Sequence, residues 1–542
     1  MSRSEALNRM EFGTPPHASA RPKPASRSAT LWREFRRWLY LLHRWTGIVL
    51  CLFFAVWFVS GLVMVYVPFP SFRAPERIET APAIDWSQVR IGPDVALAGL
   101  HQARFPAEMR LGMSDGEPVY RFVTEDGRRA VSARSGLEIG IVGRAKAAAI
   151  AADLLHAPVK SVTPVDRDQW VVTGAYRKMA PFWRVRLDDA AATDLYVMQR
   201  TGEAVQNTTA HERFWNWLGA VPHWIYFTAL RVHQEPWRQT VLWTSGIGML
   251  GALAGVWIGL LRVRLAKRYK SGSVSPYRGW MKWHHVTGLI GGIFVITWVF
   301  SGWMSMSPWG GLRDRESDAA ALYAGDRMGF PATDLAALSR SARGAREVRF
   351  AYVGGSPVMI AEGGPRGATA MDGASAQAVT VTPSRIAQIA RGAVPGGRLI
   401  AMSRLTAPDR YWYTTGDPRR DARPLPVLRL KFDDPERTWL HVDPRTGMLL
   451  GKMGSGSRSY RWLFSALHSF DLPWLLTWRP LREGLLWAFS VAGLVVSVSG
   501  IVVGWRHLTR ARRRDLKPIR QGPHPGRSRR RPGDPALLPP SR

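Results

Sequence analysis

Four long stretches of the chain carry no charged side chain, and polar segments separate them. The stretches cover residues 45–72, 240–261, 286–312 and 484–505. Each is long enough to cross a hydrocarbon core of about 30 Å as an α-helix. The pattern therefore predicts an α-helical membrane protein with four transmembrane helices, although the mean hydropathy of the whole chain is only −0.13.

The two large polar segments have the pattern of mixed α/β domains. Helical periodicity alternates there with short runs of period two that turn at Asp-Gly or Thr-Gly. The expected elements are helices at 94–105, 145–156 and 383–393, two strands within 118–136, and hairpins at 182–205 and 428–450. Such units predict small sheets that each pack a helix on one face.

The chain also repeats itself at fixed spacings. In each half a histidine stands four residues before one glycine and 18 before another; these are His43, Gly47 and Gly61, then His284, Gly288 and Gly302. A second histidine follows a tryptophan by six residues and precedes a glycine by 32; these are Trp217, His223 and Gly255, then Trp462, His468 and Gly500. The spacings predict two duplicated halves.

Most of the net charge of +33 lies in three flanking pieces. Residues 1–44 carry nine Lys+Arg against three acids, residues 262–282 carry seven against none, and residues 506–542 carry twelve against two. Positive flanks favour the cytoplasmic side, so we expect both termini in the cytoplasm and both large segments outside. Orientation and attraction to anionic membrane lipid account for the basic tail, so we expect no nucleic-acid partner.

These observations divide the chain into eleven expected parts. They are a disordered cytoplasmic tail (1–30), helix one (31–67), a periplasmic domain (68–208), an interfacial His/Trp segment (209–236), helix two (237–262), a cytoplasmic loop (263–282), helix three (283–307), a second periplasmic domain (308–456), a second interfacial segment (457–480), helix four (481–507) and a basic disordered tail (508–542).

His43 and His284 stand at matched depth near the cytoplasmic ends of two spans. Ionisable side chains within a membrane are costly and mark candidate functional sites. Neutral imidazole binds iron, copper or zinc, and one histidine from each of two facing helices would give a six-coordinate haem. The alternative is that each histidine only bonds a neighbouring carbonyl or caps a helix.

Three nearby positions belong to the same expected site. Glycine one turn below each histidine, at Gly47 and Gly288, leaves room for a flat macrocycle. Arg44 could reach a propionate, and His285 occupies the matching position in the second copy. Only the repeat register favours His284 over His285 as the ligand.

His223 and His468 lie on the other side of the membrane, about fifteen residues before helices two and four. Pro236 and Pro480 separate them from the spans, so the aromatic segments are expected to lie at the outer interface. This arrangement predicts a second bis-histidine site, with interfacial packing beside tryptophan as the alternative.

Several absences narrow the chemistry. The single cysteine, Cys51, permits no intrachain disulfide, and no CxxCH motif offers covalent haem attachment. No GxGxxG or Walker motif appears in a strand-helix unit. Electrons would therefore have to come from another protein or from quinol.

The chain resembles the bacterial PepSY-associated transmembrane proteins, also called iron-regulated membrane proteins. The resemblance rests on LHRWTG at 42–47, HHVTG at 284–288, ALHSFD at 466–471 and VDPRTGMLLG at 442–451. It covers residues 33 to about 510. Where the second half reads LHSFD, the first reads VPHWIYF, so His223 is assigned from repeat alignment.

The resemblance implies four spans and two periplasmic PepSY-type domains in the bacterial inner membrane. Some members are di-haem b-type reductases of ferric siderophores, which implies two haem b groups held by His43 and His284 and by His223 and His468. The expected function is thus a ferric or siderophore reductase. A non-enzymatic PepSY module that regulates a periplasmic partner is the alternative, and a metal or siderophore transporter is favoured least, because the spans carry few polar residues at mid-membrane.

Overall fold

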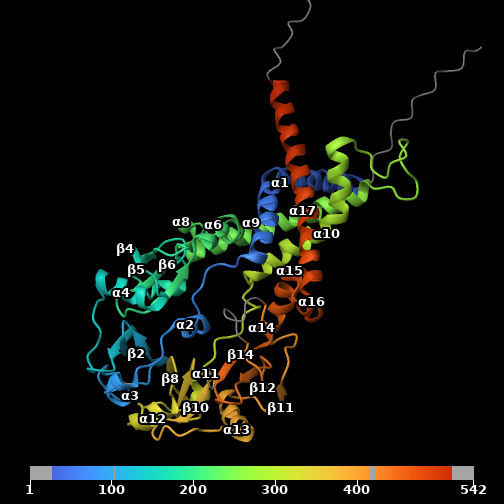
Figure 1. Ribbon diagram of the computed structural model, residues 1–542. Helices are drawn as coiled ribbons and strands as arrows, with labels where there is room; N and C mark the ends of the chain where they lie inside the picture. The colour runs from blue at the N-terminus through green and yellow to red at the C-terminus, as the bar shows by residue number, and fades with distance from the viewer. Residues whose placement is uncertain (1–26, 103, 366, 416–422, 516–542) are drawn as a thin grey trace, which may run out of the picture.

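The computed structural model describes residues 27–102, 104–365, 367–415 and 423–515. A bundle of long helices forms one end of the molecule, and three β-sheets form the other (Figure 1). The long helices are α1 (Arg27–Tyr66), α9 (Gln234–Arg262), α10 (Gly279–Ser305) and α17 (Arg479–Asp515). Among the described residues, these four are long and apolar enough to cross a membrane.

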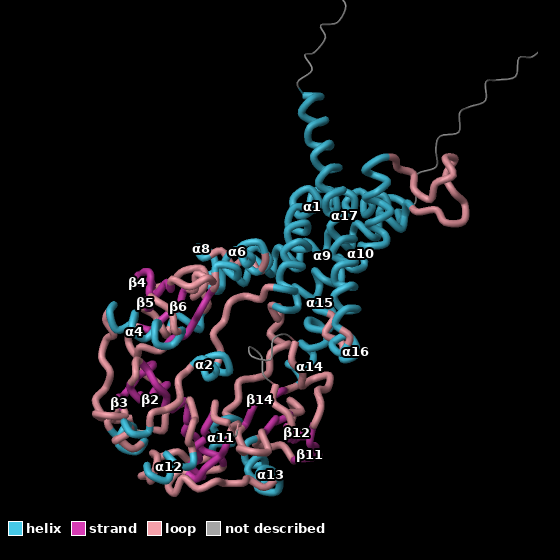
Figure 2. The backbone as a smooth tube through the Cα atoms, in the orientation of Figure 1, coloured by secondary structure: helices cyan, strands magenta, loops and turns pink. Residues whose placement is uncertain are grey.

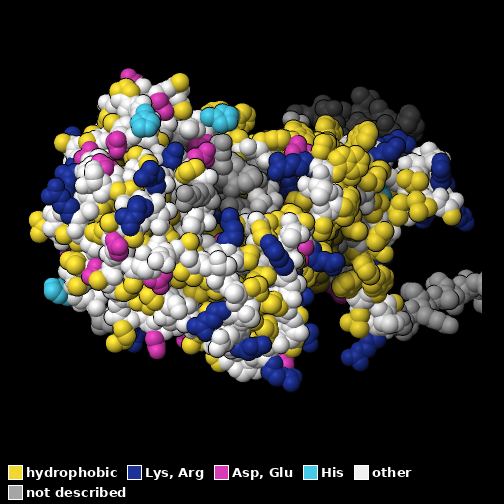
Figure 3. Space-filling model, turned by 60° about the horizontal axis from the view of Figure 1, so that its bottom comes forward, with side chains coloured by type: hydrophobic (Ala, Val, Ile, Leu, Met, Phe, Trp, Pro, Cys, Tyr) yellow, Lys and Arg dark blue, Asp and Glu magenta, His cyan; other side chains and the backbone are white. Residues whose placement is uncertain are grey.

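Each long helix packs against two others. Helix α1 contacts α9 and α17, and α10 contacts the same two helices. Phe58, Val295 and Val299 form the apolar centre of the bundle. Other apolar side chains point outward, with Trp243 and Ile290 each 68% exposed. Figure 3 shows the resulting hydrophobic surface over the bundle, which fits lipid as its surroundings.

Two helices extend into segments that we expected to be disordered. Helix α1 begins at Arg27 and α17 continues to Asp515, whereas the tails were predicted at 1–30 and 508–542. No proline or glycine interrupts residues 27–34 or 508–515, so the helices can continue past the apolar run. The remaining parts of both predicted tails, 1–26 and 516–542, lie outside the described residues.

The largest sheet has six strands in the order β10-β9-β8-β1-β2-β3. Its strands are β1 (Glu108–Ser114), β2 (Glu117–Thr124), β3 (Gly127–Ser132), β8 (Glu347–Val353), β9 (Ser356–Glu362) and β10 (Thr369–Asp372). Two four-stranded sheets flank it: β4 (Val159–Val165), β5 (Phe182–Leu187), β6 (Asp194–Met198) and β7 (Ala204–Thr208), and then β11 (Leu399–Leu405), β12 (Val427–Phe432), β13 (Trp439–Val442) and β14 (Leu449–Met453). Figure 2 shows these strands below the helix bundle.

The six-stranded sheet joins the two segments that we expected to form separate domains at 68–208 and 308–456. Strands β1 and β8 pair antiparallel, with Met109 opposite Phe350 and Leu111 opposite Val348. All four of these side chains are buried. The division into two domains therefore needs correction, because the central sheet belongs to both segments.

One helix covers each four-stranded sheet. Helix α4 (Arg144–Leu155) packs Ile150 with Val185, and α13 (Pro383–Ala393) packs Ile386 with Leu430. Both helices lie close to the predicted ranges. The helix predicted at 94–105 is shorter in the structure, where α3 covers Pro93–Ala98. Beyond its end, His101 has a positive φ of 51°.

Short helices connect these parts. They are α2 (Ala74–Thr80), η1 (Trp86–Gln88), α5 (Gly174–Arg177), α6 (Ala210–Leu218), α7 (Ala220–His223), α8 (Thr228–Arg231), α11 (Ala319–Ala324), α12 (Leu335–Ser341), α14 (Ser455–Tyr460), the π-helical turn η2 (Arg461–Ala466), α15 (Leu467–Ser469) and α16 (Pro473–Thr477). Helices α6 to α8 and α14 to α16 connect the sheets to the bundle.

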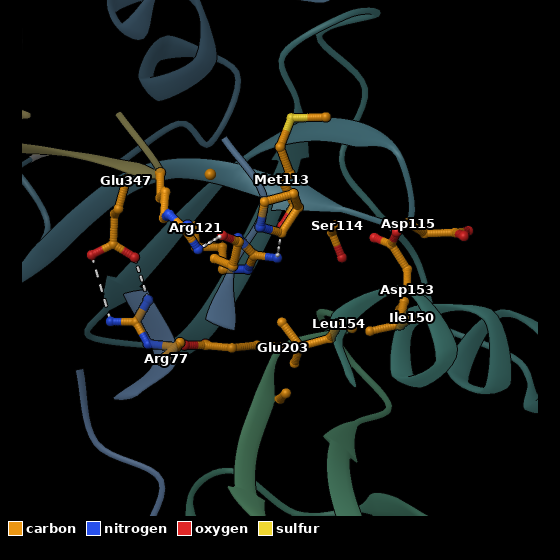
Figure 4. Close-up of a pocket in the computed structure, with 16 residues that line it drawn as sticks. Arg77, Met113, Ser114, Asp115, Arg121, Ile150, Asp153, Leu154, Glu203 and Glu347 are labelled. Atoms are coloured by element: carbon orange, nitrogen blue, oxygen red, sulfur yellow. Dashed lines mark hydrogen bonds and ion pairs between the residues drawn. The ribbon is translucent and has the colours of Figure 1, made fainter. Parts of the chain in front are cut away.

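Buried charges connect the six-stranded sheet to the β4–β7 sheet. Arg110 donates to Glu203 at 2.7 Å and to Glu347 at 3.2 Å, while Arg128 donates to Glu203 at 2.9 Å. Arg77 also pairs with Glu347, beside a cavity of about 50 Å³ (Figure 4). Burial alone would raise the pKa of the Glu203 carboxyl, but Arg110 and Arg128 hold it well below its ordinary value.

Substituting Glu203→Gln should strongly destabilise the sheets. It removes the buried carboxylate that Arg110 and Arg128 share, although Arg110 keeps its ion pair with Glu347, and this loss should cost about 3–5 kcal/mol. Because the folded pKa of Glu203 is depressed, its stabilisation is present above the unfolded pKa of about 4.3 and is lost as the pH falls below that value. Unfolding followed by tryptophan fluorescence at several pH values measures both effects.

The matched control is Glu138→Gln, because Glu138 pairs with Arg129 at the protein surface. An exposed pair contributes about 0–1 kcal/mol, so this variant should unfold nearly as the unmodified protein does. Equal losses of stability in the two variants would contradict the assigned role of the buried network.

Candidate functional site

His43 of α1 and His284 of α10 face each other inside the bundle. Their ring centroids lie 6.1 Å apart, with 30° between the ring planes. The Nδ1 of His43 lies 3.0 Å from the carbonyl oxygen of Gly251, and the Nδ1 of His284 lies 3.2 Å from that of Val496. Since a carbonyl only accepts hydrogen bonds, each Nδ1 carries the proton and each Nε2 keeps its lone pair.

His223 and His468 form a second pair with nearly the same separation. Their ring centroids lie 6.0 Å apart, and the rings are inclined by 71°. The Nδ1 of His223 lies 3.2 Å from the carbonyl oxygen of Trp57 and 3.1 Å from Ser60 Oγ. The Nδ1 of His468 lies 3.0 Å from Ser301 Oγ. Neighbouring helices therefore orient all four imidazoles.

The glycines of the repeated spacings lie against the histidines. A Cβ atom at Gly255 would lie 2.5 Å from Cε1 of His43, and one at Gly500 would lie 3.2 Å from Cε1 of His284. The corresponding distances are 3.2 Å from Gly61 to His223 and 3.5 Å from Gly302 to His468. Glycine therefore lets each ring lie directly on a facing helix.

Each histidine thus packs against a glycine from its own half of the chain. Each histidine pair, in contrast, combines one histidine from each half. The sequence spacings identified the four histidines and their glycines, but not the contacts between them. The role of Ser499, whose Oγ lies 3.1 Å from Nδ1 of His284, was missed. Ser60 and Ser301 precede Gly61 and Gly302 in the same way that Ser499 precedes Gly500, which was the available signal.

The separation of the rings fits a metal bound between them. A metal held at about 2.0 Å by one nitrogen of each ring places the two centroids roughly 6 Å apart. Gly47 and Gly288 face open space, with no atom within 4 Å of a Cβ at either position. A cavity of about 350 Å³ opens at Trp280, Trp283 and Ser499. Because Ser499 contacts His284, the cavity lies beside His43 and His284, which we call the inner pair.

No set of three or more His, Cys, Asp or Glu side chains gathers as a metal site within residues 27–102, 104–365, 367–415 and 423–515. Each histidine pair offers two imidazole nitrogens. A group bound there would have to supply the other ligands to its own metal, as a porphyrin does.

Two of the predicted site residues, His285 and Arg44, do not belong to either histidine pair. His285 is 8% exposed, with Nδ1 2.9 Å from Ser275 Oγ and Nε2 3.0 Å from the carbonyl oxygen of Gly259. Both of its ring nitrogens are engaged, so the geometry favours His284 over His285 as a ligand. Arg44 is exposed and lies over the ring of Trp45 at 5.5 Å.

A family model described as the PepSY-associated TM region matches residues 40–381. The chain belongs to this family. The match spans α1, α9 and α10 and includes His43, His223 and His284, but ends before His468. A search of curated proteins found no match. The protein is thus a multi-pass membrane protein of the PepSY-associated family, with separate β-sheet regions outside its helix bundle.

Proposed function

We propose that this PepSY-associated protein is a b-type di-haem electron conduit that reduces ferric iron, as a siderophore complex, at the periplasmic face of the bacterial inner membrane. The observation that carries the proposal is the pair of facing imidazoles at each of two levels of the bundle. Haem b held by each pair would supply one-electron chemistry, since its iron cycles between the ferric and ferrous states. Each cycle would deliver one electron to a ferric substrate and take one from a donor protein or quinol.

The distance between the two histidine pairs would place them near opposite faces of a membrane. His43 and Ser60, which contacts His223, are 17 residues apart in α1, so they lie about 26 Å apart along the helix axis. His284 and Ser301, which contacts His468, have the same separation in α10. The Nδ1 contacts would keep each imidazole neutral and its Nε2 available to iron.

The arrangement of charges supports the proposed orientation. The far end of α17 and the loop between α9 and α10 lie at the end of the bundle away from the sheets (Figure 1). Residues 262–282 and 506–542 carry 19 Lys+Arg and two acids. Positive segments favour the cytoplasm, so both termini would lie inside and the sheets in the periplasm. The matched spacings further support an origin of the two halves by duplication.

The test is the absorption spectrum of the purified protein together with a pyridine haemochrome assay. We expect a Soret band, b-type α and β bands, and two haem b groups per chain. Dithionite-reduced protein in liposomes should be reoxidised by an external ferric siderophore. Colourless protein that still binds a periplasmic partner through its sheets would overturn the proposal and favour a regulatory PepSY module.

Substituting His285→Phe should weaken the fold without removing haem. The change deletes two buried hydrogen bonds, which costs about 1–3 kcal/mol, but leaves the His43–His284 pair in place. Thermal unfolding in detergent and the haem content per chain measure the two effects. A loss of one haem at unchanged stability would instead identify His285 as the ligand.

A further inference from the structure

Arg461 is a buried cation seven residues before His468, which with His223 forms the outer histidine pair. It is 5% exposed and begins the π-helical turn η2, which leads directly into the short helix that carries His468. Its Nε donates to the carbonyl oxygen of Arg410 at 2.9 Å, and its Nη2 donates to that of Asp471. Its Nη1 is buried and has no hydrogen-bond partner within the described part of the chain.

The charges around Arg461 do not balance. Asp471 is the carboxylate beside it, but Asp471 forms its ion pair with Arg482 at 2.9 Å. Burial raises the pKa of the Asp471 carboxyl above its ordinary value, although Arg482 and Arg461 both favour its charged form. Among the residues that the structure describes, two arginines thus share one carboxylate at this position. An uncompensated buried charge is costly, so this position calls for a further anion.

The backbone contacts of the Arg461 guanidinium show which part of the chain it lies against. The guanidinium bonds the backbone of Asp471, three residues after His468, so it lies beside the turn that holds the histidine. The ring of Tyr413, 4.6 Å away, and the Arg410 carbonyl fix its orientation. At the matching position, seven residues before His223, the first half has Asn216. At this repeat position, therefore, only the second half supplies a cation.

We propose that Arg461 anchors a carboxylate at the outer pair, namely a propionate of the haem held by His223 and His468. This inference rests on the proposed function. Haem b carries two carboxylates, and arginine is suited to bind a carboxylate through parallel N–H groups. A single anchor on the His468 side would select one orientation of the haem, and its positive charge would raise the midpoint potential of that haem by favouring the ferrous state.

Potentiometric titration of the haem bands tests the assignment in the full-length protein. In Arg461→Gln we expect one of the two midpoint potentials to fall while the other stays unchanged, or the haem content to drop from two to one per chain. Arg461→Lys keeps the charge and should retain both haems. Asp471→Asn removes the competing carboxylate and should raise the same potential, which keeps the test decisive if Arg461→Gln does not fold.

Arg238→Gln is the matched control. Arg238 is the fifth residue of α9, at the end of the bundle nearer the sheets, and pairs with Glu235. It should change neither potential. The assignment is overturned if Arg461→Gln keeps both haems at unchanged potentials, or if Arg238→Gln produces the same shift. Protein without any haem would instead overturn the proposed function, and the assignment with it.

Discussion

In the proposed di-haem conduit, substituting His43→Ala or His284→Ala should reduce the haem content from two groups per chain to one and abolish transfer of electrons across the bilayer. Each change removes one of two imidazoles whose ring centroids lie 6.1 Å apart. The outer pair, about 26 Å away along α1, should keep its haem because no residue is shared between the two sites. The pyridine haemochrome assay counts the haems, and reduction of an external ferric siderophore by dithionite trapped inside liposomes measures the transfer.

The reciprocal variants His223→Ala and His468→Ala should remove the other haem. The haem left in the His43 and His284 variants should differ in spectrum and midpoint potential from the haem left in the His223 and His468 variants. The reason is that the His223 and His468 rings are inclined by 71°, and the His43 and His284 rings by 30°. His285→Phe, at the position next to His284, should retain both haems. Full haem content in His43→Ala would contradict the assigned ligands.

Much of the bundle could be predicted because a membrane restricts what a segment can do. A stretch without charge must satisfy its backbone within a helix, so the four apolar runs indicated their structure directly. Their ends were less certain. Charged residues such as Arg33 and Arg512, beyond an apolar run, can belong either to a continued helix or to an irregular segment. Composition alone does not distinguish these two structures.

The histidine pairs were predicted only because the chain repeats. One histidine near an apolar run says little, whereas matched spacings to Gly61 and Gly302 indicated equivalent positions. The choice between His284 and His285 needed the structure, since both lie at the same end of α10. The contacts that separate them come from Val496 and Ser499 on another helix, more than 200 residues away.

The central sheet was hidden for a different reason. Strand β1 follows a stretch with helical periodicity, so the strand at Glu108–Ser114 was overlooked. Its partner β8 begins at Glu347, and no local pattern indicates a pairing across that separation. The pairing of the two polar segments in one sheet is therefore visible only in the structure.

The sheets are also bonded to the segments that carry the outer histidines. Gln169, in a loop beside the β4–β7 sheet, donates to the carbonyl oxygen of Tyr226, three residues after His223. On the other side, Arg461 donates to Arg410, in a loop beside the β11–β14 sheet. In the proposed conduit, these contacts would fix the distance between the outer histidine pair and a substrate bound among the sheets.

The glycines beside the histidines give a graded prediction. Gly255→Ala should weaken haem binding at the inner pair on the order of 10–100-fold, as loss of a residue that orients a ligand typically does. Its Cβ would lie 2.5 Å from Cε1 and 2.8 Å from Nδ1 of His43, so the ring must rotate and its bond to the Gly251 carbonyl must break. Gly302→Ala should bind haem normally, because its Cβ lies at an ordinary contact distance of 3.5 Å from His468.

Gly484→Ala provides the control for the chemical change itself. Gly484 lies in α17 with no atom within 4 Å of a Cβ, so the added methyl group meets open space and should stabilise the helix by about 0.5–1 kcal/mol. Titration of haem into the haem-depleted variants measures affinity, and the ranking should follow the distances. If Gly255→Ala bound haem as tightly as Gly484→Ala, the close packing of His43 on α9 would have no part in holding the inner ligand.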